Sequence, residues 1–190
     1  MGAYQACLSV MFYHIRAFRH ICAVLDESTA ADIAAALVCS RLDYANSVLY
    51  GSPSRCLTRL QCIHYSVARI VLQQPSLSSR DTPQQLHWLP VKWRIQFKLA
   101  SLTYKVLHAA TSLYLSEHLH PYVPSRTLRS SSSTNLYIPP TNLHFGSRLF
   151  HIAAPTVWNS LPSTLHSSQT SNTFRKHLRT YPYQSAFNRP

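Results

Sequence analysis

One stretch of the chain, residues 91–109, constrains the fold more than any other. At about 3.6 residues per turn its large apolar side chains fall on two nearly opposite sides of a helix. These are Ile95, Leu99, Leu102 and Val106 on one side, and Trp93, Phe97, Ala100 and Tyr104 on the other. A helix at a protein surface needs only one apolar side. The pattern therefore predicts a helix buried on both sides, at the centre of a helical domain.

A third stripe runs between these two apolar sides, and its charged members are Arg94, Lys98 and Lys105. Three cations on one flank favour an anionic partner. The alternative is a solvated helix edge that binds nothing. This helix alone does not choose between the two interpretations.

Helical periodicity and capping residues predict further helices on both sides of residues 91–109. Thr29 and Asp32 resemble a capping box, and Ser52–Pro53 is a typical helix start. The predicted helices cover residues 3–25, 29–49, 52–73, 82–88, 113–119, 154–161 and 171–181, and residues 182–190 are expected to fray. Short, partly alternating segments near residues 135–152 predict a small antiparallel β element. The expected fold is mainly α: a three-helix unit over 1–73, a linker over 74–81, and a second region over 82–190.

Positive charge is abundant and unevenly distributed. The 190 residues include 18 Lys or Arg and 6 Asp or Glu, and the net charge is +12. Residues 52–190 hold fifteen of the cations and only two of the acids. Such a surplus indicates nucleic acid or anionic lipid as the partner. No apolar run is long enough to span a membrane and no signal peptide begins the chain, so we expect an intracellular protein, nuclear or cytoplasmic, with no membrane partner.

The residues that enzymes need are not grouped in this sequence. Its few acids are scattered, and the one adjacent pair, Asp26–Glu27, is better explained by helix capping. Cys56 and Cys62 lie on opposite sides of a helical stripe, so a metal site that they would share with His64 is not expected. The glycines form neither a phosphate loop nor a nucleophile elbow. We therefore expect no self-contained enzyme, no cofactor, no metal and no small-molecule substrate.

The five cysteines all lie in the first third of the chain and show no spacing typical of a disulfide framework. We expect them to be free and buried. The three tryptophans, Trp88, Trp93 and Trp158, lie within apolar patterns, so we expect them in the core and not stacked on bases.

Basic side chains at helical spacing are the candidates for contacts to phosphates. They recur on the helix from residue 52, on residues 91–109, in an exposed loop over 120–133 and on the last helix. The candidate residues are Arg55, Arg59, Arg69, Arg94, Lys98, Lys105, Arg126, Arg129, Arg175, Lys176 and Arg179. Contacts of this kind give affinity for RNA or a duplex without reading its sequence.

Several strings of the sequence resemble one known family. Residues 40–51, S-R-L-D-Y-A-N-S-V-L-Y-G, are similar to the S-R-L-D-Y-C-N-x-L-L-Y-G run of LINE-type, non-LTR retrotransposon reverse transcriptases of Jockey-like and related clades. Further similar strings follow in the same order along nearly the whole chain. They are L-H-W-L-P-V at 86–91, P-S-R at 124–126, G-S-R at 146–148, W-N-S-L-P at 158–162 and F-R-K at 174–176.

The resemblance implies that residues 1–73 correspond to the thumb of such an enzyme and residues 82–190 to its post-thumb region. The family's Asp-Asp catalytic box and its endonuclease lie upstream and have no counterpart here, so the sequence is expected to come from a truncated or fragmentary reading frame. Two departures are Ala45, where many relatives carry Cys, and the lack of any Cys after Cys62.

Three functional interpretations remain open at this point. The resemblance implies a non-catalytic region that binds the backbone of a template–primer duplex or of the element RNA during target-primed reverse transcription. A decayed transposon copy with no biochemical role is equally compatible with it. A helical protein-interaction module is the third, with Trp93, Phe97 and Tyr104 as its contact face. The oligomeric state stays open.

Overall fold

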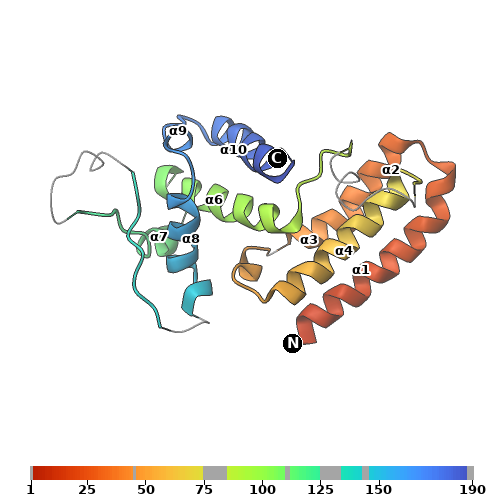
Figure 1. Ribbon diagram of the computed structural model, residues 1–190, viewed down its shortest axis with the longest axis horizontal. Helices are drawn as coiled ribbons and strands as arrows, with labels where there is room; N and C mark the ends of the chain where they lie inside the picture. Colours follow the sequence, from red (N-terminus) through yellow and green to blue (C-terminus); the bar gives the residue numbers. More distant parts are fainter. Residues whose placement is uncertain are drawn as a thin grey trace. The chain divides into compact units, whose positions relative to one another are not determined.

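The structure, a computed structural model, describes residues 2–44, 46–74, 85–109, 112–124, 134–142 and 146–187, with side chains from residue 9 to residue 181 except residue 109. The fold is mainly α, as predicted (Figure 1). The chain divides into two compact units. The first comprises residues 1–46 and 52–94, and the second comprises residues 47–51 and 95–190. The division falls after Arg94, whereas the sequence places a linker at 74–81, most of which lies outside the described residues.

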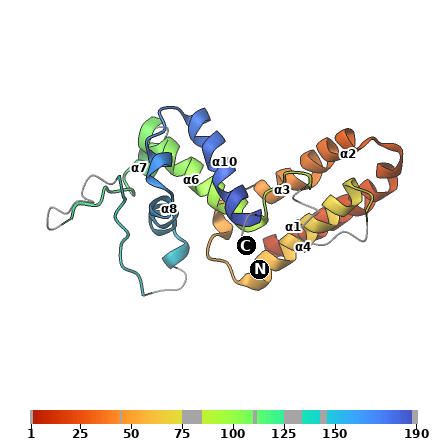
Figure 2. The ribbon, with the colours of Figure 1, turned by 45° about the horizontal axis from the view of Figure 1, so that its top comes forward.

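The first unit is built from α1 (Gly2–Ile21), η1 (Cys22–Val24), α2 (Glu27–Ala34), the π-helical turn η2 (Ala35–Cys39), α3 (Ser40–Asp43) and α4 (Ser54–Val71). α4 lies alongside both α1 and α2 (Figures 1 and 2). Met11 and Phe18 of α1 and Ile63 and Val67 of α4 are all buried in this core. Burial of these side chains is the main force that stabilises the unit.

Helix α2 is capped by Asp26, whose carboxylate the sequence assigns to helix capping, and not by the predicted capping box of Thr29 and Asp32. The Asp26 carboxylate accepts a hydrogen bond of 3.0 Å from the Thr29 N–H, so Asp26 is the N-cap and not Thr29. The helix expected over residues 29–49 is also interrupted. The backbone leaves the helix at Tyr44, and η3 (Asn46–Leu49) follows as a 3-10 turn. Asp43, Asn46 and Ser47 lie around this break, and residues of these types favour turns over a helix interior.

The second unit is organised around α6 (Val91–Ala109), whose bounds are those predicted; its first four residues belong to the first unit. Both predicted apolar sides carry buried residues, for example Ile95 and Leu99 on one side and Ala100 and Tyr104 on the other. The elements that follow are α7 (Leu113–Ser116), η4 (Gly146–Arg148), α8 (Phe150–Asn159), α9 (Ser163–His166) and α10 (Ser171–Phe187). α10 extends over residues 182–187, where fraying was expected.

Stacked rings form the core of the second unit. The Tyr104 ring lies 4.4 Å from the Phe174 ring, and the Trp158 ring lies 4.4 Å from the His166 ring, measured between centroids. Trp158 is buried, which confirms its predicted place in the core, and its Nε1–H donates to the Thr134 carbonyl at 2.9 Å. Aromatic pairs of this geometry add stability beyond the area that they bury.

The small β element predicted near residues 135–152 is wrong for the described part of that range. Only an isolated antiparallel bridge forms, between Pro121 and Leu136, while η4 and α8 occupy residues 146–159. The Asn159 side chain accepts from the Leu136 N–H at 2.9 Å and donates to the Leu136 carbonyl at 2.8 Å. A helix side chain thus takes the hydrogen bonds that a further strand on the other side of Leu136 would make.

Candidate nucleic-acid interface

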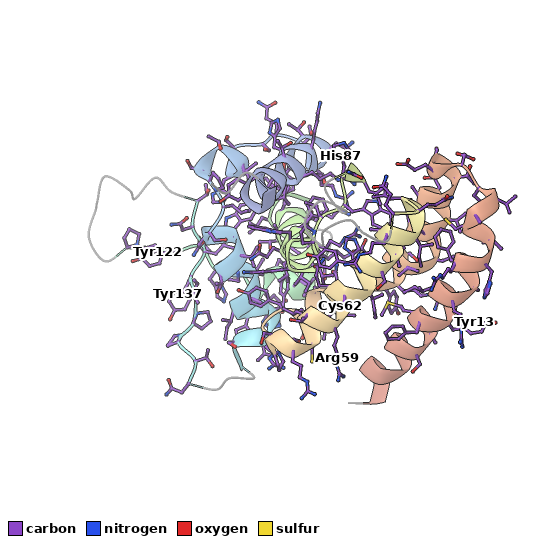
Figure 3. All side chains as sticks on the ribbon, turned by 45° about the vertical axis from the view of Figure 1, so that its right-hand side comes forward. Tyr13, Arg59, Cys62, His87, Tyr122 and Tyr137 are labelled. Atoms are coloured by element: carbon purple, nitrogen blue, oxygen red, sulfur yellow. The ribbon has the colours of Figure 1, made fainter. Side chains whose placement is uncertain are left out.

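The first group of predicted cations lies along one face of α4. Arg55 and Arg59 are exposed, and Figure 3 shows Arg59 and Cys62 on the outer side of this helix. The opposite face carries Leu60, Ile63 and Val67, all buried. Because that apolar face is held in the core, the cationic face must point outward.

The second group lies in the second unit, on α6 and α10. Lys98 is exposed and Lys105 is half-buried. On α10, Phe174 is buried against Tyr104, which leaves Arg175 and Lys176 in solvent. Helix packing therefore determines the direction in which these cations point.

Arg179 completes this second group and is held in place by an aromatic ring. Its guanidinium carbon lies 5.9 Å from the centroid of the Phe97 ring, within the range of a cation–π interaction. The side chain itself remains exposed. Arg179 thus combines a fixed position with access to solvent.

Most of these cations are not neutralised by acidic partners. Within the described residues, no ion pair forms at six of them: Arg55, Arg59, Lys98, Lys105, Arg175 and Lys176. Residues 95–190 contain nine Lys or Arg and a single acid, Glu117. Uncompensated positive charge of this kind attracts polyanions.

Arg94 is the exception, and the structure gives it a different place from the one expected. Its side chain is only 15% exposed, and its Nη1 donates to the Asp43 carboxylate at 2.9 Å. Its Nε donates to the Leu89 carbonyl at 2.8 Å. Helical spacing put Arg94 in line with Lys98, but an acid far away in the sequence binds it internally. Arg94 is therefore not part of the interface proposed below.

His64 lies against the inner side of Arg94. Its Nε2 is 3.3 Å from Arg94 Nη2, and its ring centroid is 5.3 Å from that of Trp88. Burial, and then the charge of Arg94, lower the pKa of His64 to about 3. The imidazole is therefore neutral, and since arginine can only donate, Nε2 is the acceptor. This network holds the start of α6 in place.

Gln61 supports the same helix start. Its Oε1 accepts from the Val91 N–H at 2.8 Å, which satisfies one of the backbone donors that the first turn of a helix leaves unpaired. α4 thus carries a cationic outer face and an inner face that caps α6. The outward direction of the arginines and the bond from Gln61 to α6 both depend on how α4 is rotated about its axis.

A cavity of about 920 Å³ in the first unit is lined by Arg69 and by two arginines that are not among the predicted phosphate contacts. Arg16 and Arg19 of α1 line it, opposite Ser66 and Arg69 of α4. The sequence does contain a signal for these two arginines. Arg16 and Arg19 are three residues apart, and helical spacing places them on the same face as Phe12 and Ile15. That spacing places a charge next to an apolar side chain on one helix face.

The remaining predictions have mixed outcomes. Arg126 and Arg129 lie outside the described residues. Cys22 and Cys39 are free and buried as expected, whereas Cys56 is half-buried and Cys62 is exposed. In the part of the chain that the structure describes, no three His, Cys, Asp or Glu side chains gather closely enough to hold a metal ion.

The aromatic face of α6 is largely occupied inside the chain. Tyr104 is buried under Phe174, its hydroxyl donates to the Ser168 carbonyl at 2.7 Å, and the Phe97 ring is covered by Arg179. Trp93 is half-buried. Tyr104 is therefore not accessible to another protein, and the interaction-module interpretation loses the centre of its contact face.

Comparison of the chain with protein families, with characterised proteins and with solved structures finds no significant match. Among the described helices, none combines the length and the apolar character needed to cross a bilayer. The functional conclusion therefore rests on the chain's own charge, burial and geometry.

Proposed function

We propose that this chain is a non-catalytic region that binds the phosphate backbone of RNA or of a template–primer duplex. The proposal also takes up the resemblance to the thumb and post-thumb regions of LINE-type reverse transcriptases, where such binding supports target-primed reverse transcription. The observation that carries it is the set of six cations without an ion pair in the described part of the chain. When exposed cations without acidic partners bind the phosphates of a nucleic acid, they displace the counterions condensed on its backbone.

The character of α10 favours nucleic acid over an anionic lipid surface. A helix that lies in a membrane interface places large apolar side chains beside its cations, where they can enter the lipid. On α10 the apolar residues Phe174 and Leu178 are buried in the protein, and the neighbouring Arg175 and Lys176 are exposed. Over residues 171–181, where the side chains of α10 are described, the helix offers charge without an insertable apolar face, which suits phosphates held in water.

A salt titration of RNA and duplex binding tests the proposal. If about five cations contact duplex phosphates, log affinity should fall against log salt concentration with a slope of about −4.5. The double variant Arg175→Gln/Lys176→Gln should reduce the magnitude of this slope by about 0.9 for each contact removed. Arg41→Gln, an exposed cation outside the proposed set, is the matched control and should leave the slope unchanged.

Two results would overturn the proposal. One is binding whose affinity does not depend on salt, because backbone contacts must release counterions. The other is no binding to either nucleic acid near about 50 mM salt, where electrostatic binding is strong.

A further inference from the structure

The cavity between α1 and α4, here called the α1–α4 groove, is distinct from the outward-facing cations of α10. Its two walls come from helices of the same unit, with Tyr13 and Arg16 from α1 and Ser66 and Arg69 from α4 among the lining residues. Its volume of about 920 Å³ is that of a pocket for a compact organic group (about 300–1,000 Å³). The groove is therefore large enough for nucleotide units but small for a whole helix.

Charge in the groove has one sign. Arg16, Arg19 and Arg69 line it, and none of the residues that line it is acidic. Arginines gathered around one cavity create a positive potential that attracts an anion. Guanidinium groups also match the geometry of phosphate oxygens through paired donors.

Two aromatic rings, those of Phe12 and Tyr13, line the same groove and expose much of their surface to solvent. Tyr13 is 71% exposed and Phe12 is 58% exposed, and Figure 3 shows Tyr13 projecting from α1. This contrasts with Trp158, which is 1% exposed in the other unit. Exposed aromatic rings beside arginines are typical of surfaces on which unpaired bases stack.

Hydrogen bonds hold one end of the groove in a fixed form. The Cys22 thiol donates to the Ile70 carbonyl at 3.2 Å, and the Gln73 side-chain amide donates to the Cys22 carbonyl at 3.2 Å. Both bonds join Cys22, which directly follows α1, to residues at or just after the C-terminal end of α4, and all three residues line the groove. The two walls are therefore held together before any ligand arrives, which lowers the entropic cost of binding.

We infer that the α1–α4 groove binds an unpaired segment of RNA or DNA. Arg16 and Arg19 contact successive phosphates, and a base stacks on Tyr13 or Phe12. The inference rests on the proposed nucleic-acid function and adds a preference for single strands. Stacking on a side chain requires a base whose face is open, and a duplex hides those faces.

Two other occupants fit the groove less well. A membrane surface needs an outward-facing apolar side, whereas this site is a cavity between two helices. An acidic helical peptide needs an elongated apolar groove for side chains spaced along one of its faces. Here three arginines, a serine and a glutamine share the lining with the apolar groups.

The test uses the full chain, with fluorescence anisotropy of a labelled oligouridylate of about ten nucleotides. A duplex of the same length, free uridine triphosphate, vesicles of anionic phospholipid and an acidic helical peptide serve as competitors. The variants are Arg16→Gln/Arg19→Gln, which removes charge, and Tyr13→Ala, which removes the stacking ring. Tyr13→Phe keeps the ring and is the matched control. Since Tyr13, Arg16 and Arg19 are exposed, these changes should leave the fold intact, which circular dichroism verifies.

We expect Tyr13→Ala to weaken oligouridylate binding about fivefold or more while duplex binding is unchanged. Tyr13→Phe should bind as the native chain does, and Arg16→Gln/Arg19→Gln should weaken the single strand about tenfold. Equal effects of Tyr13→Ala on single strand and duplex, or no effect on either, would overturn the inference. So would competition by the triphosphate, the vesicles or the peptide that matches competition by the unlabelled strand.

The duplex arm separates this inference from the proposed function. If the duplex binds with the expected salt slope but the groove variants do not discriminate between strands, the groove assignment alone is wrong. If neither nucleic acid binds, the proposed function fails as well.

Discussion

Arg94 and Asp43 lie 51 positions apart in the sequence and form an ion pair with an N–O distance of 2.9 Å. The pair joins the first turn of α6 to the last residue of α3. The Arg94 side chain is 15% exposed and that of Asp43 is 47% exposed, so water screens the acid more than the base. Arg94, which the sequence predicts to contact phosphates, thus stabilises the first unit through an internal ion pair.

Replacing Arg94 with methionine should destabilise the protein. Arg94→Met removes the bonds to Asp43 and to the Leu89 carbonyl, and we expect a loss of about 1–2 kcal/mol in the free energy of unfolding. Asp43→Asn should cost less, because this side chain is half-exposed and an amide oxygen still accepts. Urea denaturation measures both. The exposed Arg55→Met is the control, expected within about 0.5 kcal/mol of the native chain, and the prediction is wrong if Arg94→Met matches it.

Acid should destabilise the first unit through His64. The folded-state pKa of His64 is about 3, below its ordinary value of 6.5, so between these values the unfolded chain binds the proton more readily. The stability that this group contributes is full above pH 6.5 and is lost as the pH falls towards 3. Burial also lowers the pKa of His166, which adds an effect of the same sign.

His64→Gln separates the two histidines. The amide oxygen still accepts from Arg94, but the side chain cannot take up a proton in this range. In urea unfolding at about pH 7.5 and about pH 4.5, this variant should lose less stability on acidification than the native chain. Equal losses in the two proteins would contradict the assignment to His64.

The hydroxyl of Tyr104 should be worth a measurable part of the second unit's stability. It donates to the Ser168 carbonyl at 2.7 Å from a buried position. Tyr104→Phe leaves the stack on Phe174 intact but removes the donor, and we expect a loss of about 1 kcal/mol. Tyr122→Phe, at a tyrosine that is 52% exposed, is the comparison and should change the unfolding midpoint little. Similar midpoints for the two variants would argue against the role of the Tyr104 hydroxyl.

Gly51 should not tolerate a side chain. Its φ is +68°, a conformation that is strained for L residues with a Cβ, and a Cβ placed there lies 2.9 Å from Arg148 Cγ. Gly51→Ala should lower the free energy of unfolding by about 1–2 kcal/mol, as measured by urea denaturation. Ser52→Ala, one residue later, controls for changes in this turn. A Gly51→Ala variant as stable as Ser52→Ala would show that the turn adjusts without cost.

Periodicity in the sequence predicts the helices of this protein well where one face is apolar. α6 has the predicted bounds, and both of its apolar sides carry buried residues, because side chains at helical spacing must share a face wherever the helix packs. The same reasoning puts Arg55, Arg59, Arg175 and Lys176 in solvent, since the opposite faces of their helices are apolar. The nature of the partner is still a proposal.

Contacts between distant residues account for the features that periodicity missed. Asn159 binds both backbone groups of Leu136 where a further strand would bind them, and Asp43 withdraws Arg94 from the surface. The α1–α4 groove likewise exists only because packing brings Arg16 and Arg19 next to Arg69. Local side-chain spacing determines which face of a helix turns inward. Which acid, amide or second helix meets that face depends on pairings across tens of residues, and no pattern within one helix encodes them.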